Sequence, residues 1–321
     1  MAADKALSGL PWFSAVDLFS RVPISSAIDA IEAVLKNGHD PASDVPRTIV
    51  DTAQGQLIMM SAESEAALGV KIASVAPKNP KRALPRIQAI YLLMDSETLT
   101  PIAVFDGTAL TTLRTASVSA LAAKYLSRET ATQLLLFGAG PQARSHLDAM
   151  RSIRTIANVT IVANTQLNAE GLSRYASSVG LATRILQAGD LTEINSEVAR
   201  ADIIVCATTS STPIFSERYV SDGAHVCAIG SHEPRSREVD GFLVGRSTVV
   251  VEDQATALRE SGDILMAIEE GVFSSSSMFS ISDLVRDPSR VIDNSRPSLF
   301  KSSGMAWEDL AVAERAFRQG P

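Results

Sequence analysis

A glycine-containing turn inside an apolar segment is the strongest structural constraint in this chain of 321 residues. Residues 134–143 read LLLFGAGPQA, so an apolar run stops at a glycine and an amphipathic stretch begins near Pro141. The pattern predicts a strand, a tight turn and a helix, with Gly138, Gly140 and Ala143 in G-x-G-x-x-A spacing. Gly138 permits the turn, Gly140 lets an anion approach the backbone, and Ala143 lets the helix lie close to its strand. Taken alone, the same glycines are also compatible with a strand–turn–helix corner that needs them only for the turn and binds no ligand.

The surrounding sequence gives this turn its context. From residue 129 to about residue 255, apolar strand-like segments alternate with helical patterns, as parallel βαβ units require. The expected strands are 134–137, 159–164, 183–187, 202–208, 224–230 and 247–253, and the expected helices are 142–154, 168–179, 191–200 and 238–244. Runs of Val and Ile without alternation predict an α/β fold with a doubly wound parallel sheet covered on both faces. The glycine turn is then the first βα corner, where a dinucleotide binds.

The two ends of the chain have a different pattern. A helix (25–37) precedes strand-like segments at hairpin spacing, and the tail 307–317 has helical apolar spacing. The expected strands are 47–51, 55–62, 68–76, 87–95 and 100–107. We therefore expect a discontinuous α+β domain made of residues 1–128 and 303–321, and a dinucleotide-binding domain at 129–302.

Composition excludes several classes of function. A net charge of −7 without a basic stripe argues against nucleic acid as a partner. Cys206 and Cys227 lie in apolar strand-like runs and predict a reduced, cytoplasmic setting without disulfides. The four histidines are scattered, so no metal site is expected. No apolar run is long enough to cross a membrane, and the first residues do not resemble a secretory signal.

Lys71 stands out in the expected strand LGVKIASVA. Strand alternation places it on the same face as Ala73 and Val75. A lysine on an apolar face is costly unless it is paired, and desolvation lowers its pKa towards neutrality. Such a lysine binds an anion or donates a proton; the alternative is an edge-strand lysine whose ammonium reaches solvent.

Two arginines and one histidine are further candidates. We expect a helix capped by Thr111 or Thr112, which places Arg114 in the first turn, where a cation needs an arriving anion. The alternative is a surface arginine paired with a carboxylate, and Arg47 at a strand start carries a weaker signal. His232 follows a strand at its carboxyl end and can transfer protons there, or it can bond the backbone of its own turn.

Several separated stretches together resemble the ornithine cyclodeaminase/mu-crystallin family. They cover nearly the whole chain in order and read FDGTALTTLRTASVSALAAKYL, LLLFGAGPQARSHLDAM, CAIGSHEPRSREVD, EDQATALRESGDIL and LFKSSGMAWEDLAVA. The resemblance implies a homodimer in which each subunit has a Rossmann-type domain and a substrate/dimerisation domain built from both termini. It also implies the use of NAD(P)(H) on small α-amino or α-imino acids.

The resemblance also assigns residues. It makes Arg47, Lys71 and Arg114 the site of the substrate carboxylate, in agreement with the preference of arginine for two-point contacts with carboxylates. It assigns to the cofactor the loop Gly138, Ala139, Gly140, Gln142 and Ala143, the pair Thr208 and Thr209, and the C-terminal Lys301, Ser302 and Gly304.

Two positions depart from parts of the family pattern. His232 stands where the cyclodeaminase branch has an aspartate that is assigned to deamination, and a histidine here resembles the reductase branch. At the end of the second strand of the dinucleotide domain the chain has Asn164 and Thr165, with neither a carboxylate for the ribose of NAD nor an arginine for the phosphate of NADP. Both NADH and NADPH are therefore expected to bind, with NADPH slightly favoured.

The resulting hypothesis is an NAD(P)H-dependent reductase of cyclic imino acids, with Lys71 or His232 as the proton donor. Its substrates would be Δ1-pyrroline-2-carboxylate, giving L-proline, and the six-membered homologue, giving L-pipecolate. Ornithine cyclodeaminase or an alanine-type dehydrogenase is one alternative, and a non-catalytic small-ligand-binding protein is another. The sequence leaves the ring size, the preferred cofactor and the physiological direction open.

Overall fold

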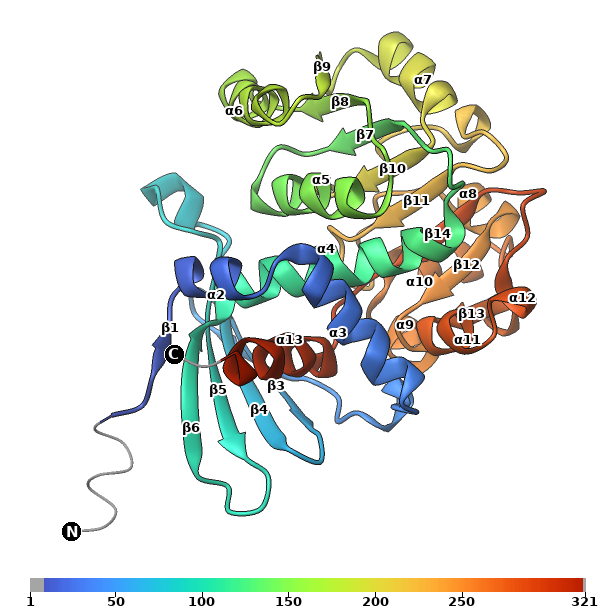
Figure 1. Cartoon of the computed structure of the whole chain (residues 1–321). Helices are drawn as coiled ribbons and strands as arrows, with labels where there is room; N and C mark the ends of the chain where they lie inside the picture. The colour runs from blue at the N-terminus through green and yellow to red at the C-terminus, as the bar shows by residue number, and fades with distance from the viewer. Residues whose placement is uncertain (1–8, 320–321) are drawn as a thin grey trace. The chain divides into compact units, whose positions relative to one another are not determined.

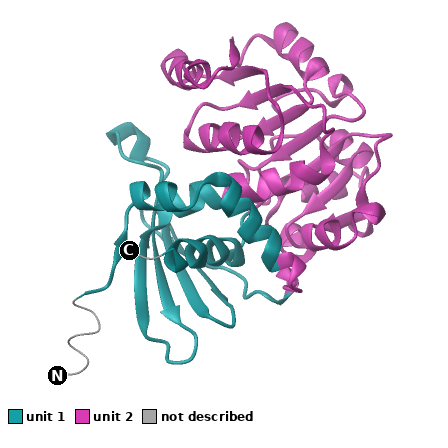
Figure 2. Cartoon of the chain, viewed as in Figure 1, with its two compact units in different colours: residues 1–34, 43–114, 304–321 teal, residues 35–42, 115–303 magenta. Residues whose placement is uncertain are grey.

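The computed structural model describes residues 9–319, which form two compact units (Figures 1 and 2). Of the described residues, unit 1 comprises 9–34, 43–114 and 304–319, and unit 2 comprises 35–42 and 115–303. The predicted domain boundary at 128/129 lies after helix α4 (Gly107–Leu126), whereas the two units divide within that helix. The second predicted boundary, at 302/303, is one residue from the division at 303/304.

Unit 1 is built on a six-stranded sheet in the order β1-β6-β5-β4-β3-β2. Strands β2 to β6 pair antiparallel with their neighbours, and only the short β1 pairs parallel. Helix α13, from the C-terminal tail, packs on β3 and β4. The elements are β1 (Trp12–Phe13), α2 (Ala15–Arg21), α3 (Ile24–Lys36), β2 (Thr48–Thr52), β3 (Gly55–Glu63), β4 (Ala67–Val75), β5 (Ile87–Asp95), β6 (Pro101–Asp106) and α13 (Ala306–Arg318).

Unit 2 contains an eight-stranded sheet in which every pairing is parallel, in the order β13-β12-β14-β11-β10-β7-β8-β9. Its strands are β7 (Gln133–Phe137), β8 (Asn158–Ala163), β9 (Ala182–Gln187), β10 (Ile203–Cys206), β11 (His225–Ala228), β12 (Thr248–Val251), β13 (Met278–Ser280) and β14 (Ser298–Lys301). Its helices are α5 (Pro141–Ile153), α6 (Gln166–Ser178), α7 (Leu191–Arg200), α8 (Gly241–Arg246), α9 (Gln254–Glu260), α10 (Gly262–Glu269), α11 (Ile281–Arg286) and α12 (Pro288–Val291). The strand order reverses between β7 and β10, which is the switch point of a doubly wound sheet. The predicted Rossmann-type α/β fold is confirmed.

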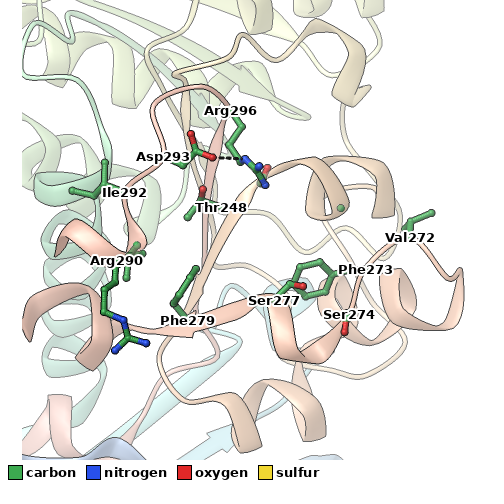
Figure 3. Close-up of a pocket in the computed structure, with 13 residues that line it drawn as sticks. Thr248, Val272, Phe273, Ser274, Ser277, Phe279, Arg290, Ile292, Asp293 and Arg296 are labelled. Atoms are coloured by element: carbon green, nitrogen blue, oxygen red, sulfur yellow. Dashed lines mark ion pairs between the residues drawn. The ribbon is translucent and has the colours of Figure 1, made fainter. Parts of the chain in front are cut away.

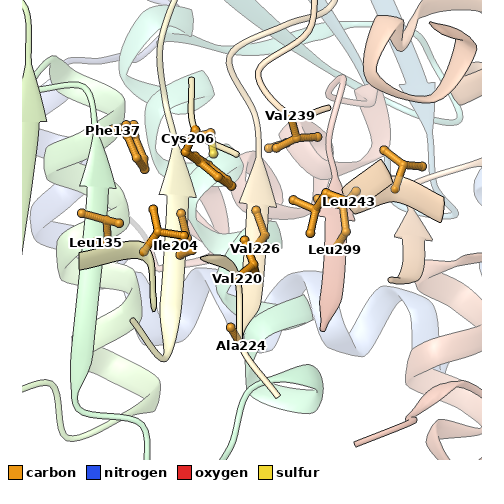
Figure 4. Close-up of a cluster of buried hydrophobic side chains, with 14 of the residues drawn as sticks. Leu135, Phe137, Ile204, Cys206, Val220, Ala224, Val226, Val239, Leu243 and Leu299 are labelled. Carbon is orange, nitrogen blue, oxygen red and sulfur yellow. The ribbon is translucent and has the colours of Figure 1, made fainter. Parts of the chain in front are cut away.

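The central strands of this sheet are buried on both faces, as their unbroken apolar runs predicted. All four residues of β10 are fully buried. On one face, side chains of β7, β10, β11 and β14 form a continuous hydrophobic cluster with α8, in which Leu135, Ile204 and Leu299 take part (Figure 4). Each fully buried Leu, Ile or Val stabilises the fold by about 1.5–3 kcal/mol. The cluster thus gives the loops at the strand ends a rigid support.

Candidate active site

The glycine turn of unit 2 has the geometry that its sequence predicted. Strand β7 ends at Phe137, helix α5 begins at Pro141, and Gly138 between them has a φ of +107°. A Cβ at Gly138 would lie 2.4 Å from the carbonyl oxygen of Ala207, so no side chain fits where β7 and β10 approach each other. A Cβ at Gly140 would meet nothing within 4 Å, which leaves open space beside the backbone at the start of α5.

The start of α5 fits a bound dinucleotide. Gly140 is the N-cap and supplies no side-chain hydrogen bond, and the first turn contains no acidic residue. The N–H groups of that turn and the positive end of the helix dipole therefore remain available to a diphosphate. The side-chain carbonyl oxygen of Gln142 is buried without a hydrogen-bond partner among residues 9–319, so it can accept a bond from a ligand hydroxyl.

The other candidate cofactor residues of unit 2 form two groups. Asn164 and Thr165 are exposed directly after β8, and one residue separates Thr208 and Thr209 from the end of β10. Because β8, β7 and β10 are neighbouring parallel strands, all four residues lie at the same edge of the sheet as the glycine turn. This is the edge at which open α/β sheets bind their ligands.

Lys301 and Ser302 are bound to other parts of the protein. Lys301 is 1% exposed, and its ammonium donates a hydrogen bond to the carbonyl oxygen of Ser231 and lies 3.1 Å from a carboxylate oxygen of Asp263. The hydroxyl of Ser302 donates to Glu252 at 2.6 Å. The geometry therefore favours a positioning role for these two side chains over direct contact with a cofactor.

The cations of unit 1 gather around the start of the C-terminal helix. The ammonium of Lys71 lies 2.6 Å from one carboxylate oxygen of Asp309, and Nε of Arg114 lies 3.4 Å from the other. Arg114 also donates a hydrogen bond of 2.7 Å to Glu308. Lys71 and Arg114 are 3% and 5% exposed, so this cluster is shielded from solvent.

Gly304 brings the third cation into the same cluster. Its carbonyl oxygen accepts a hydrogen bond from the guanidinium of Arg47. A Cβ on Gly304 would lie 2.5 Å from both terminal nitrogens of Arg114, and its φ is +82°. Glycine is therefore required at position 304 for two reasons: the positive φ, and the guanidinium of Arg114 that packs against it. Arg47, Lys71 and Arg114, which lie far apart in the sequence, are thus close together in unit 1.

The expected start of the helix carrying Arg114 was wrong. Helix α4 begins at Gly107, because the carboxylate of Asp106 accepts hydrogen bonds of 3.0 Å from the N–H groups of Thr108 and Ala109. Arg114 therefore lies in the second turn, away from the unbonded N–H groups, and the predicted Thr111 or Thr112 cap does not exist. Carboxylates from the C-terminal helix, rather than the helix end, surround the arginine.

Glu308 and Asp309 are the residues that sequence reasoning missed. Both are fully buried in α13, although they lie next to each other in the segment AWEDLAVA. An aspartate on the buried face of an amphipathic helix needs a buried partner. The position of Asp309 among apolar residues of the expected helix could therefore have indicated a buried ion pair. Three cations and two carboxylates thus lie together in unit 1. Arginine side chains in such a place can bind a further carboxylate through paired donors.

The pKa of Lys71 is lowered to about 8. Burial is the main cause, since it disfavours the charged ammonium, and the nearby Arg114 and Arg47 add repulsion. The attraction of Asp309 acts in the opposite direction. Near neutral pH the side chain is therefore protonated, but it gives up its proton far more readily than an exposed lysine does.

His232 lies in unit 2, next to the buried Ser231 in the segment after β11, and it is half-buried. It stands at the carboxyl edge of the parallel sheet, as predicted.

Comparison with known proteins places this arrangement in a family. The model of the ornithine cyclodeaminase/mu-crystallin family matches residues 13–318. The chain belongs to this family. The Δ1-pyrroline-2-carboxylate reductase of Bacillus thuringiensis subsp. konkukian is 34% identical over 267 residues, which cover 82% of this chain and 81% of that protein.

Solved structures of family members show the same fold. The structure of Thermococcus litoralis Δ1-pyrroline-2-carboxylate reductase in complex with NADH and L-proline has a TM-score of 0.88 at 28% identity, with 97% of both chains covered. An archaeal alanine dehydrogenase dimer with bound NAD has a TM-score of 0.87 at 25% identity, covering 97% of this chain and 95% of that one. The resemblance to the ornithine cyclodeaminase/mu-crystallin family is thereby confirmed.

A cavity of about 350 Å³ lies elsewhere in unit 2 (Figure 3). Thr248, the first residue of β12, lines it together with Phe273, Phe279 and Arg290. Arg296 also lines it and is paired with Asp293 at 2.8 Å. The amino end of a parallel strand points away from the edge that carries the glycine turn, so this cavity is separate from the dinucleotide site of the family.

Within residues 9–319, no group of three or more His, Cys, Asp or Glu residues is placed to hold a metal ion. Within the same range, no helix has both the length and the apolar character that crossing a membrane requires.

Proposed function

We propose that this protein is an NAD(P)H-dependent reductase of cyclic imino acids that converts Δ1-pyrroline-2-carboxylate to L-proline. The six-membered homologue, which gives L-pipecolate, is the second proposed substrate. The observation that carries the proposal is the gathering of Arg47, Lys71 and Arg114 around the start of α13. Relatives named Δ1-pyrroline-2-carboxylate reductase support the choice of substrate.

The cationic cluster has two roles in the proposed reaction. Arg47 and Arg114 bind the substrate carboxylate through their guanidinium groups, which offer paired donors. Their positive field also draws electron density from the adjacent imine carbon and makes it more electrophilic. The nicotinamide, when bound, supplies the hydride for that carbon.

Lys71 is the proposed source of the proton for the ring nitrogen. Reduction of a C=N bond to an amine needs one hydride at carbon and one proton at nitrogen. An ammonium whose pKa is about 8 is charged at neutral pH and also a competent acid. His232 is the second candidate for this role.

A panel of substrates tests the proposed function. We expect steady loss of absorbance at 340 nm with Δ1-pyrroline-2-carboxylate and NADPH or NADH, and slower loss or none with pyruvate plus ammonia. Ornithine with NAD⁺ should release no ammonia. Ammonia release from ornithine without net absorbance change would instead establish a cyclodeaminase, and cofactor binding without turnover on any substrate would establish a binding protein.

The same panel tests the cofactor preference, for which we propose a modest advantage of NADPH. The exposed Asn164 and Thr165 at the end of β8 present no carboxylate that would repel a 2′-phosphate. We expect kcat/KM to be higher with NADPH than with NADH by less than about tenfold, because Asn164 and Thr165 stand where an arginine would bind the phosphate. A strong preference for NADH would contradict this assignment.

We also propose that the protein is a homodimer formed through the open face of the unit 1 sheet. Met59, Ile72 and Ile90 are direct cross-strand neighbours and are 37%, 38% and 48% exposed. They lie on the face opposite Lys71, since adjacent residues of a strand point to opposite sides. A row of large apolar side chains across the middle of a sheet is typical of a surface that is buried on association.

Ile72→Asp is expected to convert the dimer to monomer, because a carboxylate in an apolar interface lacks a partner and costs several kcal/mol. Light scattering coupled to size exclusion measures the mass. Leu167→Asp is the matched control, since Leu167 is an exposed apolar residue of α6 in unit 2. A monomeric wild type, or a dimer unchanged by Ile72→Asp, would refute the proposed interface.

A further inference from the structure

Three charged side chains of unit 2 are fully buried behind the loops at the carboxyl edge of its sheet. Glu238, Asp263 and Lys301 are each at most 1% exposed. Burying a charge is costly unless it is paired and hydrogen-bonded. A buried charge can hold backbone N–H and C=O groups in one arrangement, which apolar side chains cannot do. All three side chains make well-defined polar contacts.

Glu238 joins the loops that follow two neighbouring strands. One of its carboxylate oxygens accepts hydrogen bonds of 2.7 Å from both the backbone N–H and the hydroxyl of Thr208, after β10. The other oxygen accepts a 2.7 Å bond from the N–H of Gly230, after β11. A single carboxylate therefore sets the separation of the two loops.

Asp263 and Lys301 hold the backbone of the second loop at Glu238, Val239 and Ser231. One oxygen of Asp263 accepts hydrogen bonds from the N–H groups of Glu238 and Val239, at 2.7 and 3.0 Å. Its other oxygen lies 3.1 Å from the ammonium of Lys301, which donates to the carbonyl oxygen of Ser231. Lys301 thus fixes the residue that immediately precedes His232.

Gly230 and Gly262 lie beside Glu238, Asp263 and Lys301 at positions where no side chain would fit. A Cβ at Gly230 would lie 2.0 Å from the carbonyl oxygen of Thr208 and 2.6 Å from the carboxylate of Glu238. A Cβ at Gly262 would lie 2.2 Å from the carbonyl oxygen of Ser236, in the same loop. The two loops are therefore packed against each other at contact distance.

We propose that Glu238, together with Asp263 and Lys301, is a positioning residue that fixes the loops of Thr208 and His232 for cofactor binding and reduction. This inference rests on the proposed function, because it concerns the same reaction. Strand β10 borders the switch point of the sheet, so the loop of Thr208 is one wall of the crevice in which such sheets bind ligands. The three side chains act through the backbone that they hold.

Glutamine cannot replace Glu238 in this role. Three donors converge on the carboxylate, two on one oxygen and one on the other. An amide would turn its NH₂ group towards either Thr208 or Gly230, and a donor facing a donor pushes that loop away. Aspartate retains two acceptor oxygens, although its shorter side chain reaches less far.

The test compares Glu238→Gln with the matched control Asp202→Asn in the full chain. The carboxylate of Asp202 also accepts two backbone hydrogen bonds, from Thr132 and Gln133 at 2.8 and 2.9 Å. It precedes β10, however, and so lies at the opposite edge of the sheet. The measurements are the Kd of NADPH by fluorescence titration without imine, kcat and KM with Δ1-pyrroline-2-carboxylate, and the thermal midpoint.

For Glu238→Gln we expect kcat to fall by about 10²-fold and the Kd of NADPH to rise by about tenfold, with KM for the imine little changed. Asp202→Asn should lower the thermal midpoint without either effect, and Glu238→Asp should recover part of the loss. If Glu238→Gln does not fold, Lys301→Met, which frees only Ser231 and Asp263, is measured in the same way.

Unchanged kcat and NADPH affinity in Glu238→Gln would overturn the inference. It would equally be overturned if Asp202→Asn reproduced the losses or if Glu238→Asp were no better than Glu238→Gln. A wild-type protein that binds NADPH but reduces no imine would refute the proposed function alone. The NADPH affinities of the variants would then still decide whether the network positions the cofactor loops.

Discussion

Lys71→Met is expected to lower kcat for Δ1-pyrroline-2-carboxylate by about 10²–10⁴-fold, the usual contribution of a positioned proton donor. Methionine approximates the length and volume of the lysine side chain but has neither its charge nor its proton. Lys71 is 3% exposed and bonded to Asp309, so its ammonium has a fixed position rather than a mobile one. Stopped-flow and steady-state assays at 340 nm measure the effect.

The affinity for NADPH should remain unchanged in Lys71→Met, because the glycine turn belongs to unit 2. Lys81→Met is the matched control, since Lys81 is exposed in the short 3-10 helix Asn79–Arg82 of unit 1 and should tolerate the same substitution. Full turnover in Lys71→Met would remove the lysine from the mechanism. A loss of turnover in both variants would show that the substitution acts through a general change of charge.

In the wild type, kcat should decrease with rising pH as Lys71 loses its proton. A donor acts in its protonated form, and the pKa of Lys71 is lowered to about 8. Activity that depends on this proton is therefore present below pH 8 and falls as the pH rises above that value. An exposed lysine would retain its proton to beyond pH 10.

The position of Lys71 was predictable because strand alternation has a period of exactly two. The buried and less buried positions of β4 alternate without exception from Ala67 to Val75, and Lys71 is on the buried face. The glycine turn was predictable for a similar reason, since only glycine can adopt the φ of Gly138 beside Ala207. In both cases, a local geometric rule determines the outcome.

The surroundings of Arg114 were not predictable from local sequence. The helix start depended on whether Asp106 or a threonine capped it, and each of these residue types is a good cap. The carboxylate bound by Arg114 comes from a position 194 residues further along the chain. No spacing rule links segments so far apart, and the pairing exists only because α13 packs on the unit 1 sheet.

The burial of Lys301 was also not predictable from the local sequence. The resemblance to the family assigned Lys301 to the cofactor site, together with Ser302 and Gly304. In the structure it is buried among Asp263 and the backbone of Ser231. Its charged partner Asp263 lies in α10 and its hydrogen-bond acceptor Ser231 lies in the loop after β11, so its burial follows from tertiary packing.

Asp309→Asn is expected to have the largest combined effect on stability and on pH dependence. Removing one partner of a buried ion pair costs about 3–5 kcal/mol, since the remaining charge keeps its desolvation penalty. Both Lys71 and Arg114 lose a neighbour in this variant. Urea unfolding should show the loss, and a domain of ordinary stability, about 5–15 kcal/mol, remains folded at 25 °C.

The pH dependence shows what Asp309 does for the reaction. Its negative charge raises the pKa of Lys71 against the opposing effects of burial and of the two arginines. Without that charge the pKa falls below about 8, so the decline of kcat with rising pH should begin at a lower pH than in the wild type. Glu308→Gln is the control, because Glu308 hydrogen-bonds Arg114, whereas Lys71 is held by Asp309.

Comparing Asp309→Asn with Glu308→Gln separates the effect on stability from the effect on proton transfer. Both variants remove a buried charge from the same cluster, so both should unfold at lower urea concentration than the wild type. Only Asp309→Asn should shift the alkaline decline of kcat. If the decline occurs at the same pH in the wild type and in both variants, then the titrating group is not Lys71, and the proton must come from a residue outside this cluster, with His232 the next to test.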